Sequence, residues 1–82
     1  MRVLYVHPTE GRGERRCLAF VDIELNEDIR LNGLRLIQQP DGRHFIYACQ
    51  AGKHRTATFS PALARKLTDI AVEAYGAANA AG

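Results

Sequence analysis

Apolar residues recur at every second position between Cys17 and Leu25. Cys17, Ala19, Val21, Ile23 and Leu25 share one face of an extended chain, and Asp22 and Glu24 mark the opposite face. A strict period of two is typical of a half-buried β-strand. The segment is therefore predicted to form a strand with one face against a core and one face in water.

The next segment, 29–37 (IRLNGLRLI), contains two apolar registers. Ile29 and Leu31 belong to one register, and Leu34 and Leu36 belong to the opposite one. A single strand needs an extra residue to do this, so the Asn-Gly at 32–33 marks either a β-bulge or a hairpin turn. The flanking pieces are short for hairpin arms, which favours the bulge. The bulge would point Arg30 and Arg35 away from the core.

Three further strands are expected from short apolar runs at 2–6, 43–49 and 56–59. The run at 43–49 (RHFIYAC) is apolar on both faces, which predicts a central position in the sheet. Polar segments at 9–16, 26–28, 39–42 and 50–55 read as turns or loops, and Gln39–Gly42 (QPDG) has the proline and glycine of a tight turn.

A helix is predicted to begin at Ser60–Pro61, because serine is a favoured N-cap and proline is tolerated in the first turn. Its apolar face repeats at helical spacing. That face comprises Leu63, Leu67, Ile70, Ala71 and Ala74. Gly76 is a plausible residue to end the helix.

The order of elements predicts an α+β fold in which a mostly antiparallel sheet of about five strands is followed by a C-terminal helix packed on it. We expect a single domain over residues 1–76 and a disordered Ala/Gly tail over 77–82. A chain of 82 residues buries only about 60% of its unfolded surface, which leaves it marginally stable alone. A second copy could cover a sheet edge and enlarge the core, so a homodimer is expected.

Composition excludes several classes of protein. No apolar run is long enough to span a bilayer, and the first residues do not resemble a signal peptide. Two cysteines, Cys17 and Cys49, are too few for a disulfide scaffold. We therefore expect a cytoplasmic protein with reduced thiols.

No pattern for metal binding or catalysis emerges. The potential ligands match no zinc spacing, and no phosphate-binding glycine motif is present. These ligands are His7, Cys17, His44, Cys49 and His54. We expect no metal, no cofactor, no small-molecule substrate and no enzymatic activity. A small enzyme would require a pocket lined by His44 or His54.

Positive charge concentrates in the second half of the chain, although the net charge is only +2. From Gly42 to Thr68 there is no acidic residue. We predict a phosphate-binding site in which Lys53, His54 and Arg55 occupy a turn, with Arg43, Arg65 and Lys66 in support. Phe45, Tyr47 and Phe59 share faces with apolar residues, which favours core positions over base-stacking ones and backbone contact over base readout.

In its order of segments the chain resembles the SpoVG family of small bacterial septation regulators, named for a stage V sporulation protein. The similarity covers about two-thirds of the chain, between Ala19 and Tyr75. It is carried by four segments: AFVDIELNEDIRLNGLRLIQ (19–38), PDGRHFIYAC (40–49), GKHRT (52–56) and SPALARKLTDIAVEAY (60–75). The chain departs from the family after Thr56, where a longer Pro-Asp-Gly loop is absent.

The resemblance implies a dimeric sheet-plus-helix regulator of septation, sporulation or cell division that binds DNA, and in some members RNA, without catalysis. It places the family's basic contact turn on Lys53, His54 and Arg55. The alternative is a protein-interaction module of the same fold that binds no nucleic acid and uses its sheet edge or acidic strand face.

Overall fold

Four strands and one helix form the body of the protein, in a computed structural model that describes residues 1–9, 16–52 and 54–81. The strands pair antiparallel in the order β1-β2-β3-β4. They span Arg2–Pro8 (β1), Arg16–Glu24 (β2), Arg30–Gln38 (β3) and His44–Tyr47 (β4). A separate pair, β5 (Gln50–Ala51) and β6 (His54–Arg55), precedes helix α1 (Pro61–Ala81).

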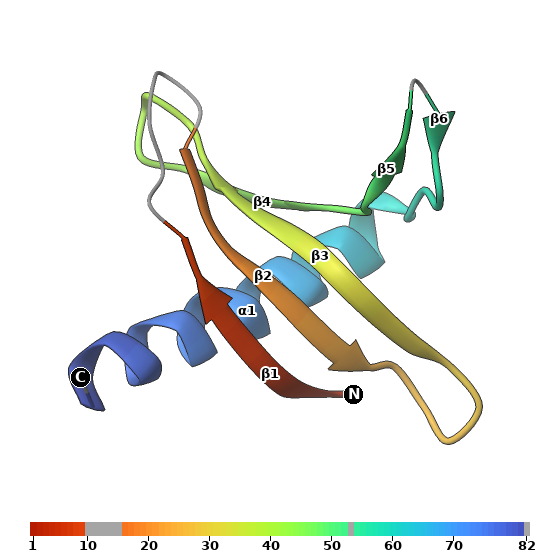
Figure 1. Ribbon diagram of the computed structural model, residues 1–82, viewed down its shortest axis with the longest axis horizontal. Helices are drawn as coiled ribbons and strands as arrows, with labels where there is room; N and C mark the ends of the chain where they lie inside the picture. The colour runs from red at the N-terminus through yellow and green to blue at the C-terminus, as the bar shows by residue number, and fades with distance from the viewer. Residues whose placement is uncertain (10–15, 53, 82) are drawn as a thin grey trace.

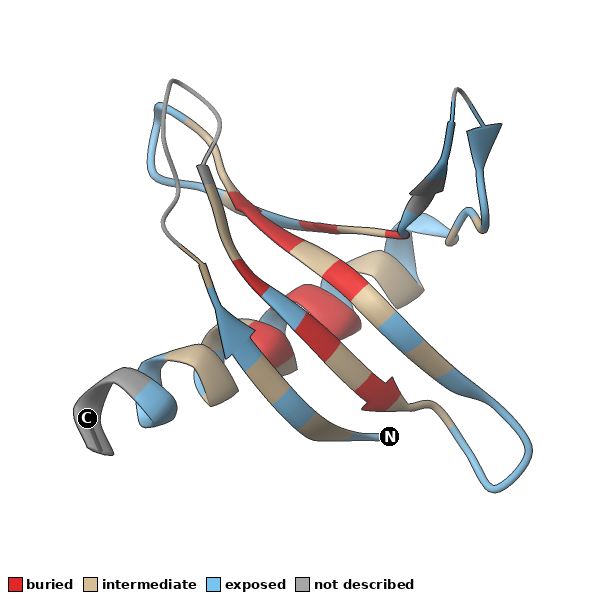
Figure 2. Cartoon of the chain, in the orientation of Figure 1, coloured by how far each residue is buried: buried red, intermediate tan, exposed pale blue. Residues whose placement is uncertain are grey.

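Helix α1 crosses one face of the sheet diagonally and leaves the other face open (Figure 1). Buried positions alternate with more exposed ones along β2 and β3, as expected for a sheet covered on one side (Figure 2). The predicted α+β arrangement, a largely antiparallel sheet followed by a C-terminal helix packed on it, is therefore confirmed.

The β-bulge predicted at Asn32–Gly33 is present. Leu31 pairs with Ile23 and Leu34 pairs with Val21, so two residues of β3 lie opposite the single residue Asp22 of β2. Gly33 has a φ of 68°, and its N–H donates a 2.8 Å hydrogen bond to Oδ1 of Asp22. The extra residue allows Leu31, Leu34 and Leu36 all to face the helix.

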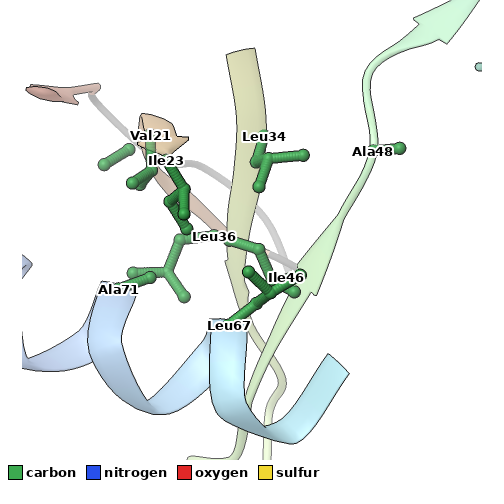
Figure 3. Packing of buried hydrophobic residues seen from close by; sticks show 9 residues of the cluster. Val21, Ile23, Leu34, Leu36, Ile46, Ala48, Leu67 and Ala71 are labelled. Atoms are coloured by element: carbon green, nitrogen blue, oxygen red, sulfur yellow. The ribbon is translucent and has the colours of Figure 1, made fainter. Parts of the chain in front are cut away.

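The core lies between the helix and the covered face of the sheet (Figure 3). Leu67 and Ala71 of α1 are fully buried against the sheet's apolar residues. The sheet contributes Ala19, Val21 and Ile23 from β2, Leu34 and Leu36 from β3, and Ile46 from β4. Leu63 and Ile70 pack against this cluster, so the predicted apolar face is confirmed at Leu63, Leu67, Ile70 and Ala71.

Two strand predictions are wrong. β4 is an edge strand rather than a central one, since it comes last in the strand order, beside β3. Its two apolar faces do not indicate a central position, because Ile46 faces the core and Phe45 is exposed on the open face. The expected strand at 56–59 is absent, and Gln50–Ala51 and His54–Arg55 pair as β5 and β6 where a turn was expected. The N–H and hydroxyl of Thr56 both donate to the carbonyl of Cys49, which holds Thr56 at the base of that hairpin.

The helix begins where the sequence predicts and ends later. Oγ of Ser60 accepts a 3.2 Å hydrogen bond from the N–H of Leu63, as an N-cap does. Helix α1 then continues through Gly76 to Ala81, so the helix end expected at Gly76 is wrong. The alanine-rich segment favours helix, and Gly76 does not adopt the positive φ of a helix-ending glycine.

Thr68 joins the helix to the edge of the sheet. Its Oγ1 accepts a 3.1 Å hydrogen bond from the N–H of Ile46 on β4 and donates a 2.7 Å bond to the carbonyl of Ala64. Thr68 is buried, and the helical periodicity of the apolar residues does not single out its hydroxyl. The bond satisfies a backbone donor that an edge strand would otherwise leave unpaired.

Gly33→Ala is expected to destabilise the protein by roughly 1–2 kcal/mol, because an alanine pays a steric cost at positive φ. Gly76→Ala is the matched control. Gly76 lies in the helix with open space beside it, so alanine should stabilise the fold by about 0.5–1 kcal/mol. Urea unfolding followed by circular dichroism measures both changes. Equal effects of the two substitutions would contradict the bulge.

Thr68→Val is expected to cost about 1–3 kcal/mol of unfolding free energy, because it leaves the N–H of Ile46 buried without an acceptor. Thr58→Val, at an exposed position before the helix, controls for the change of residue type. Amide hydrogen exchange at Ile46 should accelerate in Thr68→Val relative to that control. Unchanged protection at Ile46 would show that Thr68 does not hold the strand edge.

Candidate functional site

Two adjoining hollows lie along β4, on the side where the sheet meets the start of α1. The larger, of about 650 Å³, has a lining that includes Arg43, His44, Arg65 and Asp69. The smaller, of about 170 Å³, is lined by Arg55 and Tyr47. Phe45 and Ala64 line both hollows. We call this pair of hollows the β4-edge groove.

The groove brings together three of the cations that the sequence singled out. Arg43 precedes β4, Arg55 belongs to β6, and Arg65 lies in the second turn of α1. The chain places them at one edge of the sheet because α1 starts beside β4 and the β5–β6 hairpin connects the two (Figure 1).

The remaining predicted site residues lie elsewhere or are not described. His54 is exposed on β6, so His54 and Arg55 stand on a strand of the hairpin rather than in a turn. Lys66 is exposed on α1 and lines neither hollow of the groove. Lys53 lies outside the described residues.

Acidic side chains only partly offset the charge of the groove. Nε of Arg43 lies 3.6 Å from a carboxylate oxygen of Asp41, and both side chains are largely exposed. Exposed ion pairs of this kind contribute little and exchange readily with other partners. Asp69 is one carboxylate in a hollow lined by two guanidinium groups. The groove therefore favours an anionic ligand.

A second feature, on the open face of the sheet, was not expected. The strand register aligns His7 of β1, Phe20 of β2, Arg35 of β3 and Tyr47 of β4 in one row across the sheet. Their chain neighbours on these strands face the core, so this row faces away from the helix. Phe45 lies on the same face beside the row.

The aromatic rings of this face are accessible. Tyr5 is 64% exposed, Phe20 40% and Phe45 43%. The rings of Tyr5 and His7 stack with centroids 6.1 Å apart, and those of Phe45 and Tyr47 lie 6.4 Å apart. We call these rings, together with Arg35, the open-face platform. The prediction of core positions is wrong for Phe45 and Tyr47, and only Phe59 packs against the core.

The carboxylates of the open face are already engaged. Nε of Arg2 donates to Oε2 of Glu24. Oδ2 of Asp22 lies 3.6 Å from Nε2 of His7, and Oδ1 of Asp22 accepts the N–H of Gly33. The hydrogen bond from Arg2 holds the pKa of Glu24 below its usual value of 4.5. Glu24 is therefore charged at neutral pH, and this favourable interaction is lost as the pH falls through the lowered pKa.

Arg2→Gln is expected to raise the pKa of Glu24 toward 4.5, because the main group that favours its charged form is removed. An NMR titration of the side-chain carboxyl carbon measures the shift. Arg43→Gln, which removes the same charge at the opposite edge of the sheet, should leave the titration of Glu24 unchanged. An unshifted titration in Arg2→Gln would contradict the pairing.

The described residues hold no group of three or more histidine, cysteine, aspartate or glutamate side chains placed to bind a metal ion. In the same part of the chain, no helix is long and apolar enough to cross a membrane. Comparisons of the sequence with protein-family models and curated proteins, and of the fold with solved structures, found no match.

Proposed function

We propose that this protein is a dimeric, non-catalytic regulator that binds nucleic acid, similar in type to the SpoVG family, and that it contacts the phosphate backbone through the β4-edge groove. DNA and RNA are both candidate ligands. The site consists of Arg43, Arg55 and Arg65, with Lys53 and Lys66 supplying further positive charge and His54 a further polar side chain.

The observation that carries the proposal is that Arg43 and Arg65, far apart in sequence, line one hollow, with Arg55 in the next. Guanidinium groups bind phosphate oxygens through paired N–H donors. Three such groups along one groove suit a ligand with repeated phosphates better than a single small anion. The resemblance to the SpoVG family, which carries basic residues at 52–56, supports the same assignment.

Dimerisation is part of the proposal because the sheet ends in two edge strands, β1 and β4. Thr68 already satisfies the N–H of Ile46 at the β4 edge, and the β4-edge groove runs along the same strand. A second copy would cover edge and apolar surface that this small domain exposes, including Met1 and Ile29. Multi-angle light scattering measures the mass directly, and a monomeric mass at micromolar concentration would contradict this part of the proposal.

The double variant Arg43→Ala/Arg65→Ala is expected to weaken nucleic-acid binding alike for all sequences and to flatten its dependence on salt. If about four to five phosphates are neutralised, log affinity falls with log salt at a slope of roughly −4 on duplex DNA. Losing two contacts should reduce that slope by about 2. Fluorescence anisotropy with labelled DNA and RNA of mixed sequence, at low and moderate salt, measures both quantities.

Arg30→Ala is the matched control, since Arg30 is an exposed arginine at the far end of β3 from the residues that pair with β4. It removes one positive charge without touching the groove, so affinity should change only slightly. Equal losses in Arg30→Ala and in single groove variants would point to net charge rather than a site. A folded protein that binds neither nucleic acid at low salt would overturn the proposed function.

A further inference from the structure

Arg35 occupies an unusual position at the centre of the open face. Its cross-strand neighbours are Phe20 on β2 and Tyr47 on β4. Its Nε is buried yet has no hydrogen-bond partner among the described residues. A buried donor without an acceptor is costly, and a bound ligand toward which the guanidinium turned would supply the acceptor.

From this arrangement we infer that the open-face platform binds the bases of a single-stranded nucleic acid, while the phosphates of the same strand follow the β4-edge groove. The inference rests on the proposed function and specifies its ligand as single-stranded rather than duplex. Arg35 would donate to an acceptor oxygen or nitrogen of the bound strand, between bases that stack on Phe20, Phe45 and Tyr47.

The platform has the geometry that base stacking requires. Adjacent strands lie about 4.8 Å apart, so the row from His7 to Tyr47 spans about 14 Å. Four-stranded sheets with exposed aromatics bind two or three unstacked bases in this way. A duplex keeps its bases stacked on one another and cannot offer their faces to the rings. The platform therefore selects single strands.

The platform and the groove are continuous at β4. Phe45 belongs to the platform and also lines both hollows of the groove, and Tyr47 lines the smaller hollow beside Arg55. A strand whose bases lie on the open face therefore meets guanidinium groups where it passes the edge. This adjacency of flat rings and cations matches a polyanion with aromatic bases.

A second copy of the chain is the other possible occupant, and the charges favour nucleic acid. Among the described residues, Glu24 is paired with Arg2, and Asp22 accepts the N–H of Gly33 and lies 3.6 Å from His7, so neither carboxylate is bonded to Arg35 at the centre of the face. A second copy would bring the same positive centre to this face. An anionic partner is complementary to it.

Phe45→Ala is the first test, in anisotropy titrations of a 12-nucleotide single-stranded RNA, the same sequence as single-stranded DNA, and its DNA duplex. Loss of one stacking ring should weaken binding of the single strands by about 5- to 150-fold. Binding of the duplex should weaken less, because a duplex meets Phe45 only where the ring lines the groove. Phe45→Tyr keeps the ring and should retain affinity. Arg35→Gln should also weaken binding of the single strands.

A spectroscopic readout tests stacking itself. The chain has no tryptophan, so Phe45→Trp introduces a single reporter whose fluorescence should be quenched when an oligonucleotide stacks on it. Tyr75→Trp, at a position on α1 that packs against the core and lines neither hollow of the groove, is the control and should show little quenching. Circular dichroism verifies that each variant is folded.

The outcomes separate this inference from the proposed function. Equal binding of single strands and duplex, unaffected by Phe45→Ala but lost in Arg43→Ala/Arg65→Ala, would overturn the platform and leave the groove in place. No binding of any oligonucleotide would overturn both. A fall in dimer mass on Phe45→Ala would make the open face the subunit interface and overturn the platform.

Discussion

One helix packed across a four-stranded sheet is the constraint on which the rest of this structure depends. Leu67 and Ala71 of α1 are fully buried against the sheet's covered face. The helix is the only one in the described part of the chain, so it can cover only one of the two faces. Every residue whose side chain points the other way must tolerate water or find a ligand.

The β-bulge matters because it keeps β3 consistent with that single covered face. Without the extra residue at Asn32–Gly33, either Leu31 or the pair Leu34 and Leu36 would point into solvent. Asp22 closes the bulge through the N–H of Gly33. The same bulge keeps Arg35 on the open face. The irregularity that lets β3 contribute to the core therefore also positions the central arginine of the platform.

The β4 edge shows how closely stability and the proposed function are connected. Thr68 satisfies the N–H of Ile46 and so anchors the start of α1 beside the strand. Arg65 lies one turn before Thr68, and this anchoring places it in the same hollow as Arg43. The proposed phosphate contacts therefore depend on the hydrogen bond that protects the strand edge.

The sequence alone determined those structural elements that depend only on residues close together in the chain. The alternation over 17–25, the change of apolar register at Asn32–Gly33, the turn at Gln39–Gly42 and the cap at Ser60 each require only neighbouring residues, and all are present. The charge gap from Gly42 to Thr68 likewise indicated Arg43, Arg55 and Arg65. Only the tertiary structure decided which face the helix covers and that β4 lies at an edge. These depend on strand order and register between distant segments, which is why Phe45 and Tyr47 could be mistaken for core residues and why the row through Arg35 could not be foreseen.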